Sequence, residues 1–174
     1  MTWNWRTDFV GDDKKRSGLG NAVSFLLNGL PPMWWIRLML HMQSKDTRLS
    51  RFISRRIARH LMREWGIHIS VLVKSVGHGV KFPHPVGIVI GDGTIIEDDV
   101  VILQNVTIGR RMTGDTGCPI IRRGAKIMAG AVIAGNITVG ENATIGANAV
   151  VLADVPDNAV AAGVPAKIIN KKTV

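Results

Sequence analysis

The feature that most constrains the fold is a six-residue step between large aliphatic residues in the second half of the chain. The step starts at Ile90, pauses after Ile108 and resumes at Ile121. It places ten residues in one phase: Ile90, Ile96, Ile102, Ile108, Ile121, Ile127, Ile133, Val139, Ile145 and Val151. A period of six fits neither an α-helix nor a simple hairpin, and it is typical of hexapeptide repeats that wind a parallel β-helix. We therefore predict a mainly β fold of four to five coils, with these aliphatic side chains inside.

The residues around each aliphatic position agree with this geometry. Two positions earlier the residue is small or β-branched, as at Thr94, Ala131 and Ala149. The residue directly after it is often glycine, which suits a sharp corner. The repeat returns in register after residues 109–120, so we expect that segment to leave the coil as a protruding loop, a common place for function.

The first part of the chain has a different pattern and divides the sequence into two regions. We predict an N-terminal arm and α-helical region over residues 1–66 and a β-helix domain over residues 67–174. A proline pair, Pro31–Pro32, is expected to interrupt the helical region, because proline can open a helix but does not fit inside one. Leu49, Phe52, Ile53, Ile57 and Leu61 recur at helical spacing among many arginines, which predicts an amphipathic helix with a buried apolar stripe and a basic face.

The charge of the chain is concentrated in this helical region. Residues 1–70 hold 12 Lys and Arg against 5 Asp and Glu, a balance of +7 out of +9 for the whole chain. A solvated helix face is one interpretation, and peripheral contact with the inner face of a membrane through Trp34, Trp35 and the arginines is another. No nucleic-acid-binding motif accompanies the charge, so we expect no nucleic-acid partner. The single Cys118 and the lack of a signal-peptide pattern favour the cytoplasm.

Three segments of the β-helix domain carry a resemblance to a known family. They are HPVGIVIGDGTIIEDDVVILQNVTIG from His84, AGAVIAGNITVGENATIGANAVV, and VPDNAVAAGVPAKII. Over about residues 67–170 the chain is similar to hexapeptide-repeat acyltransferases, and most similar to their serine acetyltransferase branch and its polysaccharide-modifying relatives. This resemblance implies a left-handed β-helix, acetyl-CoA as acyl donor, no metal, and a homotrimer with sites shared between subunits.

His84 is the predicted catalytic residue. The resemblance implies that it is the base that deprotonates the acceptor hydroxyl as the thioester is attacked. Independently, His84 lies six residues before Ile90, so we expect it in the aliphatic phase, where a polar ring breaks the rule of the lattice.

The chain departs from serine acetyltransferases at positions that suit an amino-acid acceptor. An Asp before the catalytic His is here Pro83, an orienting Asp fifteen residues earlier is Ile69, and an Arg-His pair in the loop is Gly117-Cys118. Such charged groups grip a zwitterion, so their loss favours a saccharide hydroxyl as acceptor, in surface polysaccharide or glycoconjugate synthesis. Two alternatives stay open: L-serine as acceptor, for cysteine biosynthesis, and a non-catalytic β-helix scaffold.

The remaining candidates surround these two substrates. His78, Asp115, Cys118 and Gln104 are acceptor-site candidates. The resemblance implies a pantetheine groove between coils of neighbouring subunits, lined by small residues. The candidates for binding the cofactor are Ala129, Gly130, Ala147 and Gly163, with Lys167, Arg122, Arg123 and Lys126 as partners for CoA phosphates. We predict no metal site, because His68, His78 and His84 have no further ligand at a fitting spacing.

Overall fold

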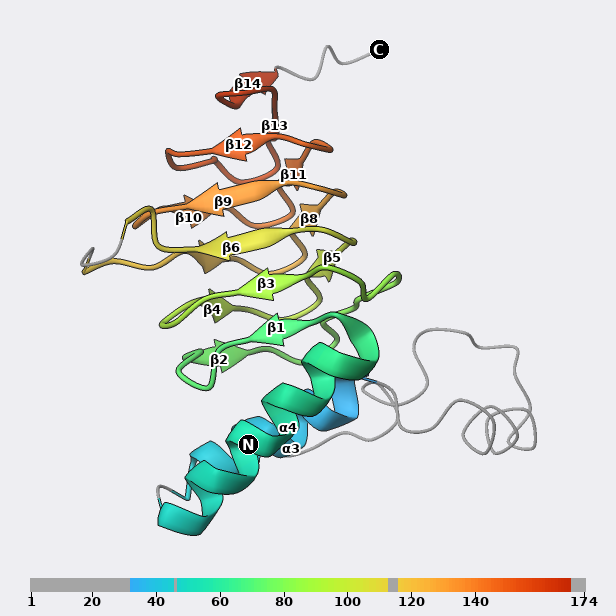
Figure 1. Ribbon diagram of the computed structural model, residues 1–174. Coiled ribbons are helices and arrows are strands. Elements are labelled where there is room, and N and C mark those ends of the chain that lie inside the picture. The colour runs from blue at the N-terminus through green and yellow to red at the C-terminus, as the bar shows by residue number, and fades with distance from the viewer. Residues whose placement is uncertain (1–31, 46, 113–115, 170–174) are drawn as a thin grey trace.

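The computed structural model describes residues 32–45, 47–112 and 116–169. They form a tapering stack of parallel coils with a pair of helices at the lower end (Figure 1). The fold is a left-handed β-helix with an α-helical region before it, as the sequence predicts. The predicted N-terminal arm lies outside the described residues.

Three sheets form the sides of the β-helix. Sheet A has the order β1-β3-β6-β9-β12, sheet B the order β10-β7-β4-β2, and sheet C the order β14-β13-β11-β8-β5. All pairs are parallel except β13 with β14, which closes the top as an antiparallel pair. The strands of sheet A are β1 (His68–Ile69), β3 (Val89–Ile90), β6 (Thr107–Gly109), β9 (Val132–Ala134) and β12 (Val150–Val151). Those of sheet B are β2 (Ser75–Val76), β4 (Ile95–Ile96), β7 (Ile120–Ile121) and β10 (Thr138–Val139), and those of sheet C are β5 (Val101–Ile102), β8 (Lys126–Ile127), β11 (Thr144–Ile145), β13 (Val160–Ala162) and β14 (Lys167–Ile169).

The predicted aliphatic phase forms the core. All ten aliphatic residues of the six-residue step are buried, and they stack from coil to coil within each sheet, as Ile90 does with Ile108 and Ile96 with Ile121. The small residues two positions earlier are buried as well, from Thr94 and Val100 to Ala149. Burial of this continuous apolar column is the main stabilising term of such a solenoid.

The coils are equal in length in the upper part of the β-helix and longer in the lower part. Ile121 pairs with Val139, three hexads further along the chain. Ile96 pairs with Ile121 across a longer stretch of sequence, because the loop after β6 lies between them. The stretch from Ile69 to its partner Ile90 is also longer than three hexads. The predicted protruding loop is therefore one of two places where the lattice is expanded.

The extra residues of the first coil change the position of His84. Lys81 forms a parallel bridge with Val101, so Phe82 lies opposite the buried Ile102 and takes the inward position. His84 follows shortly afterwards, in the turn that leads to β3, and its side chain is exposed. The prediction that His84 occupies the aliphatic phase is wrong, because counting back from Ile90 ignores the residues inserted in this turn.

Corners of the coil use residues that tolerate the left-handed backbone conformation. Asn105, Asn142 and Asn148 have φ between 54° and 58°. A glycine lies beneath each of these side chains. A Cβ on Gly124, for example, would lie 2.3 Å from Oδ1 of Asn142. Both the left-handed φ of Gly124 and the close approach of the next coil therefore require glycine there.

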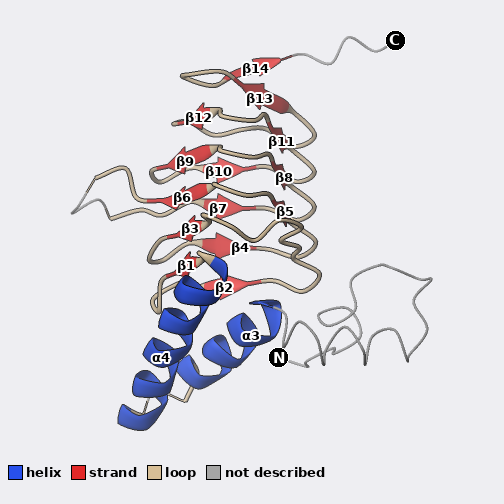
Figure 2. Cartoon of the chain, turned by 45° about the vertical axis from the view of Figure 1, so that its right-hand side comes forward, coloured by secondary structure: helices blue, strands red, loops and turns tan. Residues whose placement is uncertain are grey.

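Two helices close the lower end of the β-helix (Figure 2). Helix α3 (Pro32–Gln43) starts at the second proline of the predicted interruption. Helix α4 (Arg48–Trp65) starts at a capping box between Thr47 and Ser50 and ends at Gly66, whose φ of 62° is left-handed. Ile36, Met39, Ile57 and Leu61 are buried in the same cluster as the β-helix core.

The predicted apolar stripe of α4 is only partly buried. Ile57 and Leu61 are buried and Ile53 is half-buried, but Leu49 and Phe52 are exposed. The prediction that Leu49 and Phe52 belong to the buried stripe is therefore wrong. Two serines of α4, Ser50 and Ser54, face the core instead, and the Ser54 hydroxyl donates to the carbonyl oxygen of Ser50. These two small residues lie on the side of α4 that faces the core, and they allow the helix to approach α3 closely.

Polar contacts fix the helix pair to the first coil. Arg37 in α3 donates to the carbonyl oxygens of Val76 and Gly77, and Gln43 donates to the carbonyl oxygen of Val71. Neither of the two described helices is long and apolar enough to cross a membrane.

Candidate active site

Each corner of the β-helix joins two sheets and is named after them, so the AB corner leads from sheet A to sheet B. The candidate residues are located by these corners. The AB corner comprises the described residues 70–74, 91–94, 110–112, 116–119, 135–137 and 152–154. The BC corner comprises 77–80, 97–100, 122–125, 140–143 and 156–159, and the CA corner comprises 82–88, 103–106, 128–131, 146–149 and 163–166.

His84 lies at the CA corner, in its expanded lowest turn. Its carbonyl oxygen accepts a hydrogen bond from Val86 N at 2.8 Å, which closes a tight turn around Pro85. The imidazole is exposed and forms no hydrogen bond with another described residue, so its orientation comes from the turn alone. An exposed imidazole at a corner is accessible to substrates, as a general base must be.

Gln104 lies one coil above His84 at the same corner. The Asn105 N–H donates to the carbonyl oxygen of Val86 at 2.8 Å, which sets the two turns directly on each other. Oε1 of Gln104 is buried and has no hydrogen-bond partner among the described residues. A buried acceptor without a donor is costly, and such atoms are often functional.

The small cofactor-binding candidates continue this column upward. Ala129 and Ala147 occupy the same place in successive coils, since Asn148 N donates to the Ala129 carbonyl oxygen at 2.9 Å. Gly130 lies beside Ala129, and Gly163 forms the top of the corner just before Lys167 in β14. The structure thus brings His84, Gln104, the four small residues and Lys167 onto one edge of the molecule.

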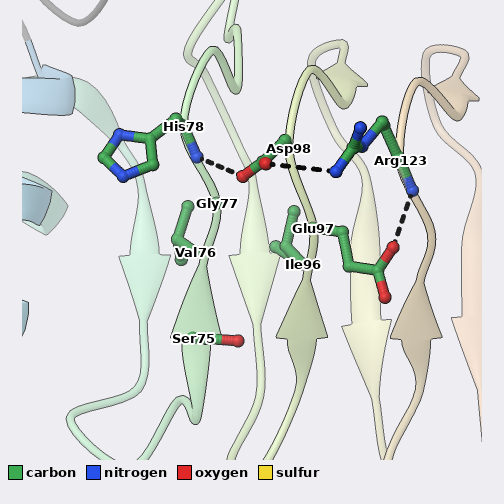
Figure 3. A pocket seen from close by; sticks show the side chains of 8 residues that line it. All are labelled: Ser75, Val76, Gly77, His78, Ile96, Glu97, Asp98 and Arg123. Carbon is green, nitrogen blue, oxygen red and sulfur yellow. Dashed lines mark hydrogen bonds and ion pairs between the residues drawn. The ribbon is translucent and has the colours of Figure 1, made fainter. Parts of the chain in front are cut away.

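The other candidates lie elsewhere. Lys126 faces outward from sheet C. At the BC corner are Arg122, His78 and Arg123, and Figure 3 shows the last two. There His78 N donates to Oδ1 of Asp98 at 2.7 Å, and Asp98 lies 3.7 Å from Arg123.

His78, Asp98 and Arg123 line a shallow pocket of about 230 Å³ between the first coils. Its carboxylates are already engaged by the protein, since Glu97 pairs with Arg122 at 3.0 Å and accepts from Arg123 N. The structure separates this pocket from His84 by a whole side of the β-helix. Of the three histidines considered as ligands, His68 is in sheet A, His78 at the BC corner and His84 at the CA corner.

The AB corner holds Cys118 at the base of the protruding loop, while Asp115 lies outside the described residues. Nε of Arg110 lies 3.4 Å from Sγ of Cys118. The neighbouring turn carries Asp92, whose carboxylate accepts a hydrogen bond from the Ser70 hydroxyl. Gly93 contacts Cys118 so closely that a Cβ there would lie 2.5 Å from Sγ.

The sequence argument missed Asp92 and Arg110. They flank the positions where the expected charged residues are absent, because Ser70 follows Ile69 and Arg110 contacts Cys118. The sequence does contain both charged groups, a carboxylate in the first turn after Ile90 and a guanidinium at the start of the loop. They were overlooked because charged residues were sought only at the positions where serine acetyltransferases have them.

Comparison with known proteins defines the class. Residues 118–153 match the family described as bacterial transferase hexapeptide (six repeats). The prediction of a hexapeptide-repeat β-helix similar to the serine acetyltransferase branch is confirmed.

The particular relatives are serine acetyltransferases. The chain is 53% identical to the serine acetyltransferase of Haemophilus influenzae over 99 residues, which are 56% of this chain and 37% of that protein. A serine acetyltransferase structure in complex with CoA superposes with a TM-score of 0.71 and 39% identity, covering 84% of this chain and 60% of that one. The structure of a soybean serine acetyltransferase complexed with serine superposes with a TM-score of 0.73 and 31% identity, covering 89% of this chain and 64% of that one. The chain therefore spans just over a third of that curated relative and under two thirds of the two structures.

These relatives correct the prediction of a saccharide acceptor, which is wrong. The similarity is to proteins named for serine, at about half of all positions in the matched region. The prediction treated three missing charged side chains as the loss of amino-acid recognition. The structure shows a carboxylate and a guanidinium next to two of the vacated positions, so the charge types that a zwitterion requires are present.

Proposed function

We propose that this chain is an O-acetyltransferase that transfers the acetyl group of acetyl-CoA to the hydroxyl of L-serine, with His84 as general base. The observation that carries the proposal is the 53% identity to a serine acetyltransferase over 99 residues of this chain. The exposed imidazole of His84 and the column of small residues above it support the same conclusion.

The chemistry needs one base and one binding groove. The serine hydroxyl attacks the thioester carbonyl while its proton passes to the imidazole of His84. The tetrahedral intermediate then breaks its C–S bond, and the leaving thiolate takes the proton back from His84 as CoA thiol. Positioned acid–base catalysis of this kind contributes about 10² to 10⁴ in rate.

Gln104 is proposed as a contact for the reacting acceptor. Its buried Oε1 lacks a donor in the described structure, and its turn sits directly on that of His84. A hydroxyl or ammonium group of the acceptor supplies the missing donor. The resulting hydrogen bond would hold the acceptor over the imidazole.

Asp92 and Arg110 are proposed to recognise the charged ends of serine. A carboxylate pairs with the ammonium group and a guanidinium pairs with the carboxylate. Both residues lie at the AB corner, and strand β3 separates this corner from His84 within one chain. A complete site therefore needs His84 from one subunit and the AB corner of another.

This requirement supports the proposal of a homotrimer with sites between subunits. Sheet A presents Val89, Val132 and Val150 outward, which leaves an apolar side face exposed or half-buried in the single chain. Packing of such faces around a threefold axis removes them from water. The same contact would form the donor groove along Ala129, Gly130, Ala147 and Gly163, with Lys167 near CoA phosphates.

The test is release of CoA thiol from acetyl-CoA by the purified chain with L-serine, serine methyl ester, N-acetylserine or a panel of sugars and nucleotide sugars. The proposal predicts rapid release with L-serine and at least about tenfold less with either blocked analogue, since each loses one charged contact. Asp92→Asn should raise KM for L-serine more than it lowers kcat.

Two outcomes would contradict the proposal. Faster release with a sugar than with L-serine would show that the acceptor is not the amino acid. Binding of CoA without thiol release for any acceptor would favour a non-catalytic scaffold.

A further inference from the structure

The face of helix α4 that points away from the core is both basic and apolar. Residues spaced three or four apart lie on one helix face, so Phe52, Arg55, Arg56, Arg59 and Arg63 form a continuous strip. This strip is opposite Ile57 and Leu61, which are buried in the core. We call it, together with Leu49, the outer face of α4.

Apolar side chains on the outer face are unusually accessible. Phe52 is 58% exposed and Leu49 is 68% exposed. Both are in the first two turns of the helix and are surrounded by arginines. Exposed apolar groups set among cations are typical of helices that lie at a membrane surface.

Within the described part of the chain, the arginines of the outer face are not neutralised by neighbours. Arg55, Arg56, Arg59 and Arg63 form no ion pair with another residue of the described ranges. Glu64 is the only acidic residue within the helix. The face therefore carries a net positive field into solvent.

We propose that the outer face of α4 docks onto anionic phospholipid headgroups, with Phe52 and Leu49 entering the interface between them. The guanidinium groups pair with lipid phosphates, and the two apolar side chains leave water. Binding is peripheral and reversible, because one helix face with two apolar side chains buries little area. This inference is independent of the acetyl-transfer proposal.

Other occupants of the face fit these observations less well. A second copy packed face to face would oppose arginine to arginine, which is unfavourable. A nucleic acid satisfies the charge but offers no apolar layer for Phe52 and Leu49, which would stay in water.

The tryptophans named with the arginines in the sequence hypothesis are not part of this face. Trp35 packs against His60 with ring centroids 4.6 Å apart, and Trp34 packs edge-on against Trp35 at 5.0 Å. They join α3 to α4 and stabilise the pair. Phe52 and Leu49 take the place that the tryptophans were expected to have.

The experiment is sedimentation of the full chain with vesicles of phosphatidylcholine alone or with phosphatidylglycerol added. We expect binding only to the anionic vesicles, weakening as salt is raised. Arg59→Gln/Arg63→Gln should weaken binding by about thirty-fold, because each cation near the surface contributes about five- to sixfold. Phe52→Ser should weaken it by about tenfold through loss of apolar burial.

The matched control is Lys74→Gln/Arg111→Gln, which removes two exposed charges from the β-helix and should leave vesicle binding within about twofold of wild type. The melting temperature of every variant is measured, and only variants that melt at the wild-type temperature are compared, so that unfolding is not mistaken for loss of binding. Equal binding to both vesicle types, or an equal effect of the control, would overturn the proposal. So would tighter binding to a short RNA that Phe52→Ser leaves unchanged, or self-association that Phe52→Ser abolishes.

Discussion

The upper coils and the first coil of the β-helix follow different rules. From Ile121 to Val151 every coil consists of three complete hexads, and left-handed residues recur at the corners, as at Gly124, Gly130, Asn142 and Asn148. The first coil, from Ile69 to its partner Ile90, is longer than three hexads, and its extra residues include the turn of His84. The regular coils contain no residues beyond their three hexads, whereas the first coil and the protruding loop contain several additional residues.

This difference separates structural from chemical roles. Regular coils provide a rigid column, along which Ala129 and Ala147 line a narrow edge. The expanded turns place polar side chains outside the lattice, as they do for His84 and Arg110, while Asp92 lies at a regular corner beside the loop. Function on loops held by a rigid scaffold is a general arrangement.

The largest expected effect comes from changing coil length. Deleting Gly140 and Glu141 leaves too short a connection between Val139 and the next strand to turn the corner. We expect destabilisation beyond the roughly 5 kcal/mol of the costliest core truncations, visible as loss of cooperative thermal unfolding.

The matched deletion removes Pro83 and His84 from the first coil. It gives that turn the spacing of the regular ones, so the free energy of unfolding should change by less than about 1 kcal/mol. A collapse as severe as that of the other deletion would erase the distinction between the two regions.

A second test concerns the core of a regular coil. Ile127→Ala should lower the free energy of unfolding by about 3 kcal/mol, because Ile127 is completely buried and its removal leaves a cavity. Lys126→Ala, at the outward position of the same strand, should stay within about 0.5 kcal/mol. Denaturant titration measures both, and similar values would contradict the alternation of inward and outward positions.

The corner geometry provides a third test. Gly124→Ala should cost about 2 kcal/mol, because its φ of 68° is left-handed and the new Cβ would meet Asn142 at 2.3 Å. At Gly109 the nearest atom to an added Cβ is 3.8 Å away, so Gly109→Ala should not destabilise. Thermal melts of the two variants decide the matter, and equal midpoints would show that these corners tolerate a side chain.

The smallest expected effect is a gain in stability on substitution of Thr94. Its hydroxyl is buried with no hydrogen-bond partner among the described residues, at a position where the next hexads have Val100 and Val106. Thr94→Val should raise the free energy of unfolding by about 1 kcal/mol, since it removes an unsatisfied polar group without changing shape. Thr94→Ser keeps the hydroxyl, loses the methyl group and should lower it by a similar amount. A loss for valine as well would indicate a donor or acceptor for that hydroxyl.

The core of the fold was predictable because its signal is periodic. Ten aliphatic positions and their small neighbours specify which residues point inward, and the structure buries all of them. Periodicity fails where residues are inserted, because phase cannot be counted across an insertion. That failure put His84 in the wrong phase. In α4, spacing alone did not show that serines rather than Leu49 and Phe52 face the core.

The candidate site was predictable only in part. The sequence pointed to His84 and to the small residues of the CA corner, which the structure gathers on one edge. It could not show that Arg122 and Arg123 already pair with Glu97 and Asp98, because these contacts join different coils. Asp92 and Arg110 became candidates only through their neighbours in space.

We propose that the expanded turn of the first coil supplies the base for acetyl transfer, and His84→Ala removes that base. CoA thiol release with L-serine would be measured alongside the melting temperature, with His41→Ala, at an exposed position of α3, as the control for loss of another histidine. We expect His84→Ala to lower kcat by about 10² to 10⁴ with an unchanged melting temperature, while His41→Ala retains activity. A kcat within a few-fold of wild type for His84→Ala would show that another group is the base.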